Sequence, residues 1–157
     1  MPLTLRENVP SAIVLLERVQ KANPDDPLLT NNLTFALAIT GEVNRAIAEF
    51  SKISRFEKSE INSYVYNATG GLLEFRIGNT ENGRRRYSQS IEYFEKNKKN
   101  DHALHCKSQL AFEELRLGFI DEAEKIISEL SDLEAQKKKQ EFKSLTSKLI
   151  DTLENSD

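Results

Sequence analysis

The stretch GEVNRAIAEF, residues 41–50, places a small residue, Ala46, five positions after Gly41 and a large apolar residue, Phe50, four positions after Ala46. The same two offsets occur twice more, at Gly78, Gly83 and Tyr87 and at Gly118, Ala123 and Ile127. A looser copy without the glycine contains Ala12, Leu16, Val19 and Pro24. Repetition at a nearly constant period predicts a stack of similar units rather than one central core.

Apolar residues recur at helical rather than alternating spacing in almost every segment longer than ten residues. We expect helices over residues 11–22, 27–40, 43–55, 60–77, 81–94, 102–117, 123–130 and 137–155. Four side chains are suited to N-cap positions, namely Asp26, Ser59, Thr80 and Asp101. The three repeated glycines are expected to end helices in the left-handed conformation. The inward face of the first helix is expected to contain Ala12, Leu15, Leu16 and Val19.

Short connections between these helices favour antiparallel neighbours, and no candidate strand interrupts them. The sequence therefore predicts an all-α fold of stacked antiparallel helix hairpins, in one domain over residues 1–157. In each hairpin the small residue lets the two helices approach closely, and the large residue fills the space before the next hairpin. The helix over 137–155 is expected to be a C-terminal capping helix that covers the open end of the stack with Phe142, Leu145, Leu149 and Leu153.

The segment from Ser11 to Ile53 resembles the tetratricopeptide repeat, whose signature includes A-x3-F and a later proline. Ala12 and Ala46 are 34 residues apart, which is the period of that family. Other signature positions are matched by Leu33, Gly41, Phe50 and Pro24. The later copies are looser, because their glycines are 37 and 40 residues apart and Glu74 and Glu114 replace the tyrosine of the signature. The resemblance implies a right-handed α-solenoid that binds other proteins.

The resemblance also implies that ligands bind along a concave face formed by the first helix of each hairpin. Alignment on the three glycines puts Asn32, Thr69 and Gln109 in one column, Phe35, Leu72 and Phe112 in the next, and Ile39, Arg76 and Arg116 in a third. We expect a peptide to contact Asn32, Phe35, Thr69, Arg76, Gln109, Phe112 and Arg116. In the alternative interpretation the apolar column only packs against neighbouring helices. The family's pattern of paired lysines and asparagines is not at these positions, so binding of chaperone C-terminal tails is not expected.

Composition limits the function classes further. The formal net charge is −3, and no apolar run approaches the roughly 18 residues of a membrane span. No signal peptide is visible and Cys106 is the single cysteine, so we expect a cytoplasmic protein. His102, His105 and Cys106 are close in sequence, but no second cluster of metal ligands exists, so no metal or cofactor is expected.

These observations predict a scaffold that binds a peptide or a helical segment of a protein, with no catalytic residues and no enzymatic activity. The first copy contains only the second helix of a repeat, so an alternative is a regulatory, targeting or oligomerisation domain excised from a larger enzyme or signalling protein. Its partner would then be another domain of the parent chain. Self-association is compatible with both, and a membrane partner with neither. An RNA-binding helical repeat is the second alternative, and it rests only on the run Arg84, Arg85 and Arg86.

Overall fold

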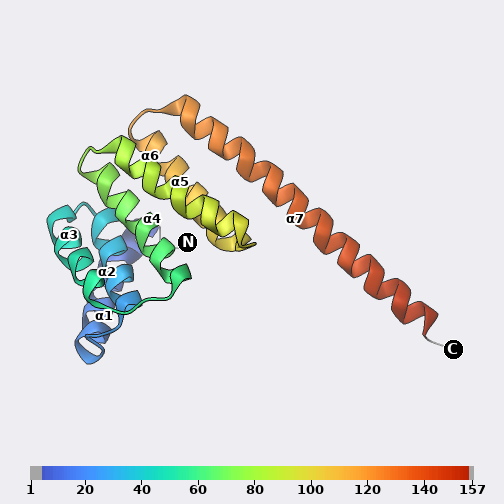
Figure 1. Ribbon diagram of the computed structural model, residues 1–157, viewed down its shortest axis with the longest axis horizontal. Coiled ribbons are helices and arrows are strands. Elements are labelled where there is room, and N and C mark those ends of the chain that lie inside the picture. The colour runs from blue at the N-terminus through green and yellow to red at the C-terminus, as the bar shows by residue number, and fades with distance from the viewer. Residues whose placement is uncertain (1–4, 156–157) are drawn as a thin grey trace.

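The protein is all-α over the part of the chain that its structure, a computed structural model, describes: the backbone of 5–155 and the side chains of 10–132, 140 and 142–155. This part contains seven α-helices, one short 3-10 helix and no strand, and Figure 1 labels the α-helices. Their bounds are α1 Leu5–Ala22, α2 Pro27–Ile39, α3 Val43–Ser51, η1 Lys52–Arg55, α4 Glu60–Arg76, α5 Thr80–Lys96, α6 Asn100–Arg116 and α7 Ile120–Glu154. None of these helices combines the length and the apolarity needed to cross a membrane.

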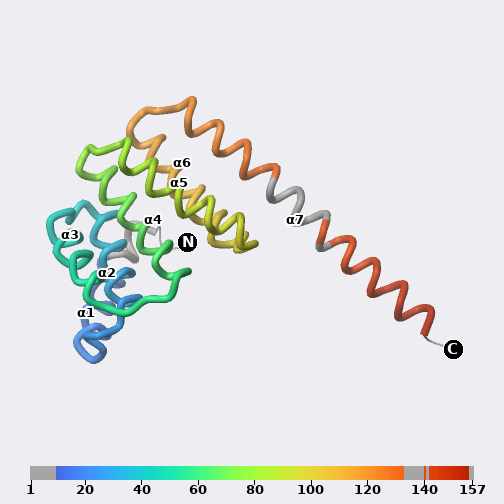
Figure 2. Tube along the Cα trace, viewed as in Figure 1, coloured from blue at the N-terminus to red at the C-terminus, as the bar shows by residue number. Residues whose placement is uncertain are grey.

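Each α-helix packs against the next α-helix along the chain, and Figure 2 traces their course in space. In addition, α2 packs against α4, and α4 packs against α6. These three alternate helices therefore lie in one layer, and they are the first helices of the three successive helix pairs. At the two ends of the described chain, the backbone of α1 lies close to that of α2 alone, and the backbone of α7 lies close to that of α6 alone.

The helix ends at Gly41, Gly78 and Gly118 are confirmed, and all three glycines have positive φ, of +90°, +92° and +86°. At the first of them, the Gly41 N–H donates to the Ala38 carbonyl at 3.2 Å and the Glu42 N–H donates to the Leu37 carbonyl at 2.9 Å. This pair of bonds is the Schellman motif, which satisfies the last carbonyls of a helix and requires a left-handed residue. The same two bonds close α4 and α6.

A fourth turn of this kind ends α5 without a glycine. Lys98 has φ of 57°, and the N–H of Lys99 donates to the carbonyl of Phe94 at 2.7 Å. Lys99 becomes the N-cap residue of α6, which begins at Asn100. The expected N-cap at Asp101 is therefore wrong, because the tight turn starts the helix earlier.

Of the other three expected N-caps, two are confirmed and one is wrong. Asp26 is confirmed, since its Oδ1 accepts hydrogen bonds from the N–H groups of Leu28 and Leu29 at 2.9 and 3.3 Å. Ser59 is also confirmed as the cap of α4. Thr80 is the first residue inside α5 rather than its cap.

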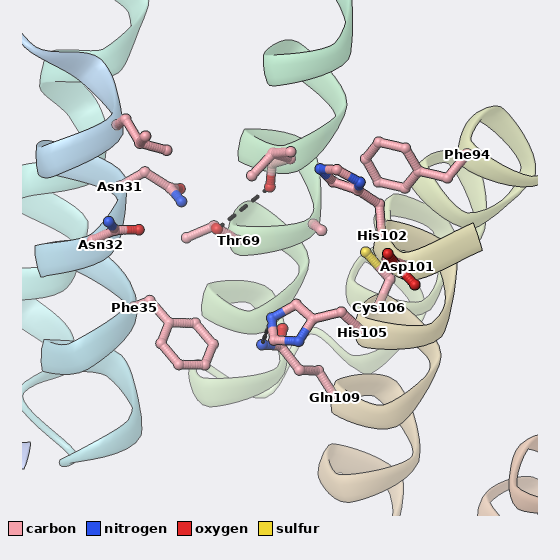
Figure 3. Close-up of a pocket in the computed structure, with 13 residues that line it drawn as sticks. Asn31, Asn32, Phe35, Thr69, Phe94, Asp101, His102, His105, Cys106 and Gln109 are labelled. Carbon is pink, nitrogen blue, oxygen red and sulfur yellow. Dashed lines mark hydrogen bonds between the residues drawn. The ribbon is translucent and has the colours of Figure 1, made fainter. Parts of the chain in front are cut away.

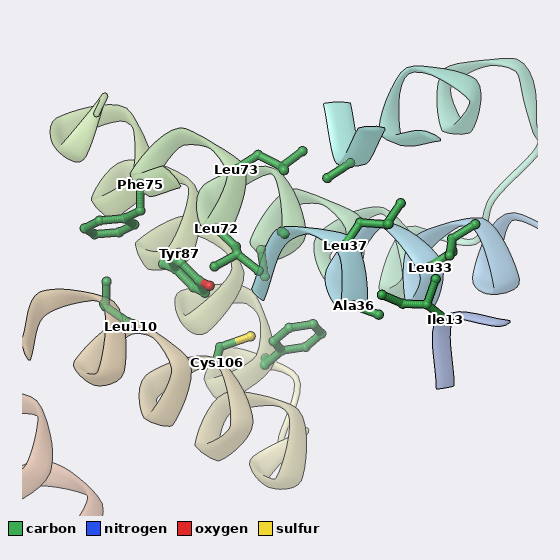
Figure 4. Close-up of a cluster of buried hydrophobic side chains, with 14 of the residues drawn as sticks. Ile13, Leu33, Ala36, Leu37, Leu72, Leu73, Phe75, Tyr87, Cys106 and Leu110 are labelled. Atoms are coloured by element: carbon green, nitrogen blue, oxygen red, sulfur yellow. The ribbon is translucent and has the colours of Figure 1, made fainter. Parts of the chain in front are cut away.

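Three of the four small residues of the repeat pattern are buried, as predicted: Ala46 and Ala123 are fully covered, and Gly83 is buried between α4 and α5. The prediction is wrong for Ala12, which is exposed. A methyl group at Gly83 would lie 2.5 Å from Cδ2 of Phe75 and 3.0 Å from the carbonyl oxygen of Gly71. The α4–α5 crossing is therefore too close for a side chain here. Figure 4 shows the core around this crossing, with Phe75 and Tyr87 near Leu110.

The large residues of the pattern differ in how deeply they are buried. Tyr87 is fully buried, Phe50 is half-buried, and Ile127 is 44% exposed. Ile127 was expected to pack inward, and the difference has a simple cause: no further hairpin comes after α7 among the described residues.

The structure also corrects the first helix. It begins at Leu5 rather than at residue 11, and it continues through Pro10. Ile13 is buried and Leu16 is half-buried, whereas Ala12, Leu15 and Val19 are exposed. Polar contacts explain this rotation of the helix, because Gln20 donates to Thr30 of α2 and to Glu49 of α3.

The segment 137–155 does not form a helix of its own that returns over the stack. It continues α7, and no glycine or proline between Ile120 and Glu154 interrupts the helix. Figure 1 shows α7 extending away from the other helices. The expected capping residues are largely exposed, Phe142 at 72%, Leu145 at 67%, Leu149 at 64% and Leu153 at 68%.

Replacement of Gly83 by alanine should destabilise the protein, although alanine is the better helix former. We expect a loss of roughly 1–3 kcal/mol in the free energy of unfolding, because the new methyl group meets the backbone of Gly71 as well as a ring. Urea unfolding followed by circular dichroism measures it. The exposed Ser88→Ala in the same helix is the control and should be neutral or slightly stabilising. Equal stability of Gly83→Ala and the parent would contradict the close crossing.

Candidate functional site

Two adjoining cavities lie along α2, α4 and α6, and together they are called the groove here. The narrow cavity has a volume of about 370 Å³ and the wide cavity about 990 Å³. Both are lined by Phe35 of α2 and by His105 and Gln109 of α6. Pro10 of α1 adds to the wall of the wide cavity.

The structure brings all seven residues of the predicted peptide site to this groove. Asn32 and Thr69 line the narrow cavity, and Phe35 and Gln109 line both. The remaining three, Arg76, Phe112 and Arg116, line the wide cavity. Residues at the same distances before the three glycines therefore line the same two adjoining cavities.

Figure 3 shows side chains from three helices converging on the narrow cavity: Asn32 and Phe35 from α2, Thr69 from α4, and His105 and Gln109 from α6. The Gln109 amide is held in place on both sides. Its Nε2 lies 2.8 Å from Nε2 of His105, and its Oε1 accepts from the Tyr87 hydroxyl at 3.5 Å. Burial raises the pKa of Tyr87, which therefore remains a protonated donor.

Asn31 also lines the narrow cavity, and it is only 5% exposed. Its Oδ1 is buried and has no hydrogen-bond partner among the described residues. A buried acceptor without a donor costs on the order of 1–3 kcal/mol. The wall of this cavity therefore contains an amide oxygen that a hydrogen-bond donor would stabilise.

The apolar column does not behave as one group. Leu72 is 2% exposed and belongs to the core, as the alternative interpretation predicted for the whole column. Phe35 is half-buried against that core. Phe112, in contrast, is 60% exposed in the wall of the wide cavity, where it offers a ring to a ligand.

The two arginines of the groove are tied to one buried carboxylate, Glu113, which is 1% exposed. Arg76 donates from Nε and Nη2 to Glu113 Oε1 at 3.0 and 2.7 Å. Arg116 donates from Nε to Glu113 Oε2 at 2.7 Å. The side chains of Arg76 and Arg116 are 12% and 33% exposed. The cluster carries one net positive charge. Arg116 is the more exposed of the two arginines, and it makes one hydrogen bond to Glu113 where Arg76 makes two.

Sequence reasoning did not assign several residues of this wall to the peptide site, among them Glu113, Asn31 and His105. A signal for Glu113 was present, because the glycine alignment places it in a column with Ala36 and Leu73, both buried. A carboxylate in a buried column requires a cation nearby.

The arginine run does not form a basic surface. Arg84 donates from Nε and Nη2 to the buried Glu114 at 2.6 and 2.8 Å, and its guanidinium lies 4.7 Å from the centre of the Phe119 ring. Arg86 Nε lies 3.9 Å from Glu74 Oε1. Only Arg85 of this run is fully exposed. Two of the three arginine side chains in this run therefore lie beside carboxylates of the same chain.

His102, His105 and Cys106 all line the narrow cavity, but they do not face a common centre there (Figure 3). The His102 ring lies 5.0 Å from the ring of Phe94. Within the described residues, no group of three or more His, Cys, Asp or Glu side chains is arranged to hold a metal ion.

Comparison with protein-family models, with curated proteins and with solved structures finds no match to this chain.

Glu113→Gln should cost roughly 3–5 kcal/mol of unfolding free energy, because it leaves Arg76 in a buried position without its counter-charge. Glutamine has nearly the same size, so lost packing does not explain such a loss. Chemical denaturation of the two proteins measures the difference. Glu129→Gln is the matched control, because Glu129 is half exposed and its contact to Lys107 is long, at 3.6 Å. A small effect of Glu113→Gln, equal to that of the control, would show that the cluster is dispensable for the fold.

Cys106 should be unreactive in the folded protein. Burial raises the pKa of its thiol to about 12, so almost none of the reactive thiolate is present at pH 8. We expect a thiol-specific disulfide reagent to label Cys106 at least 100-fold more slowly in buffer than in concentrated urea. Labelling at equal rates in both conditions would mean that the helices around the narrow cavity open readily.

Proposed function

We propose that this chain is a tetratricopeptide-like, right-handed α-solenoid and that it binds a peptide or a helical segment of a protein partner in the groove, without catalysis. One observation carries this proposal. The seven residues of the predicted peptide site, aligned by their distance from three glycines on three different helices, lie around two adjoining cavities. Peptide grooves of this kind combine a few apolar anchors with polar groups that orient the ligand.

The groove favours a particular kind of ligand. The exposed ring of Phe112 suits an apolar side chain in the wide cavity. Arg116, which shares Glu113 with Arg76, suits an acidic side chain or a terminal carboxylate. At the other end, the unpartnered Oδ1 of Asn31 and the amide of Asn32 suit an N–H donor of the ligand.

A second candidate is that the chain is a regulatory, targeting or oligomerisation domain of a larger protein. It is favoured by the apolar surface of α1, where Val14 is 50% exposed and Leu15 is 61% exposed. This surface would contact another domain, and the groove would remain the ligand site. RNA binding has no comparable support, because Arg84 and Arg86 face carboxylates.

Selection from a random peptide library on the immobilised protein tests the proposal directly. We expect retained peptides to bind the Phe112→Asp variant at least 10-fold more weakly, because the variant removes the apolar anchor and adds a repelling charge beside an acidic ligand. Fluorescence anisotropy of a labelled peptide measures the affinity. Ile120→Asp is the control, since Ile120 is similarly exposed, at 56%, but lies at the start of α7, outside the groove.

The control should bind like the parent, and both variants should keep the helical circular dichroism of the parent. Peptides that bind Phe112→Asp as tightly as the parent, or a library from which no peptide is retained, would refute the groove as a peptide site.

A further inference from the structure

The outer half of α7 packs its backbone against no other helix that the structure describes. At 1.5 Å per residue, the 35 residues of α7 extend over about 52 Å, whereas the 17 residues of α6 extend over about 26 Å. Among the described helices, α6 is the one whose backbone packs against α7. About half of α7 therefore continues beyond the helix that supports it, as Figure 1 shows.

This outer half has the pattern of a helix-packing surface. Phe142, Leu145, Leu149 and Leu153 follow one another at offsets of three, four and four, which places them on one side of the helix. Ile150, which is 49% exposed, lies at the edge of the same side. These five residues are called the α7 stripe. An exposed stripe of this kind marks an interaction site.

We propose that the α7 stripe binds the same stripe of a second copy of this chain, with the two helices antiparallel. A two-fold axis between Ser147 and Lys148 sets Phe142 against Leu153 of the partner subunit and Leu145 against Ile150 of the partner subunit. Every large apolar residue of the stripe except Leu149 then has an apolar residue opposite it, and Leu149 meets Thr146 of the partner subunit. The stripe is thus complementary to itself, as a two-fold interface requires.

Charge determines the orientation of the two helices. Residues 142–148 contain two lysines and no acidic residue, whereas residues 149–155 contain one aspartate, one glutamate and no basic residue. Antiparallel helices place the basic half of one copy beside the acidic half of the other. Parallel helices in register would place like charges side by side, which is unfavourable.

The area is sufficient for a dimer of moderate stability. Five large side chains in each copy are 49–72% exposed, and covering them in both copies removes on the order of 1,000 Å² from water, near the lower limit for a specific interface. We expect a dissociation constant on the order of 10 µM.

The α7 dimer does not depend on the peptide site. The groove is lined by residues of α1, α2, α4, α5 and α6, so it stays open in both copies. A dimer would present two grooves and would bind a divalent partner with a higher apparent affinity than a monomer does.

Light scattering and sedimentation of the full chain between about 1 and 300 µM test the association, across the expected dissociation constant. The mass should rise from that of the 17.9 kDa monomer to twice that value. Leu145→Glu with Leu149→Glu should remain monomeric at every concentration. Ser144→Glu with Ser147→Glu adds the same charge to the other sides of the helix and should still dimerise. A parent chain that stays monomeric throughout, or a dimer that survives the double leucine change, would overturn the proposal.

Disulfide trapping tests the orientation. A mixture of the single variants Leu145→Cys and Ile150→Cys should form a crosslinked heterodimer on mild oxidation, because these positions face each other only in antiparallel helices. Leu145→Cys alone should not crosslink, and rapid crosslinking of that variant would indicate parallel helices and contradict the proposal. The parent chain, with its buried Cys106, provides the uncrosslinked control. If neither combination crosslinks while the mass doubles, the dimer forms elsewhere and the proposal is wrong.

Discussion

The left-handed residue at the end of α2, α4 and α6 is the constraint on which the rest of the structure depends. At Gly41 the left-handed residue lets the chain turn back between α2 and α3, and the Schellman hydrogen bonds satisfy the last carbonyls of α2. The same turn recurs after α4 and α6, so the three helices return to one layer. Residues at equal distances before the three turns then occupy equivalent places, and the groove results from that equivalence.

Charged side chains on α6 add a second constraint, on the position of this helix relative to the preceding pair. Glu113 and Glu114 are neighbours in sequence and both are 1% exposed, but they face different helices. The first accepts from Arg76 of α4, and the second accepts from Arg84 of α5. A shift of α6 along α5 would leave Glu114 buried without its cation, and a shift along α4 would leave Glu113 with Arg116 alone, which is costly. The position of the groove wall on α6 is thereby tied to α4.

Sequence alone predicted the features that depend on local chemistry or on the repeat: the all-α class, the glycine turns, the caps at Asp26 and Ser59, and the seven residues that line the groove. It did not predict the turn at Lys98, because lysine gives no signal of a positive φ. It chose the wrong face of α1, because residues 12–16 are all apolar and do not single out one side. The partner of Glu113 depends on proximity between helices, which spacing along one chain does not determine.

The large position of the repeat shows what its apolar residue signals. Tyr87 and Ile127 occupy equivalent places after their glycines, but Tyr87 is fully buried and Ile127 is 44% exposed. The two differ because a further helix, α6, packs against α5 and its Tyr87, whereas α7 is the last described helix and has no such neighbour among the described residues. An apolar residue at this position therefore packs within its own hairpin, as Tyr87 does against Phe75, and also against a following helix where one is present. Among the described residues of α7, Ile127 and the α7 stripe are exposed, and the proposed dimer would cover the stripe.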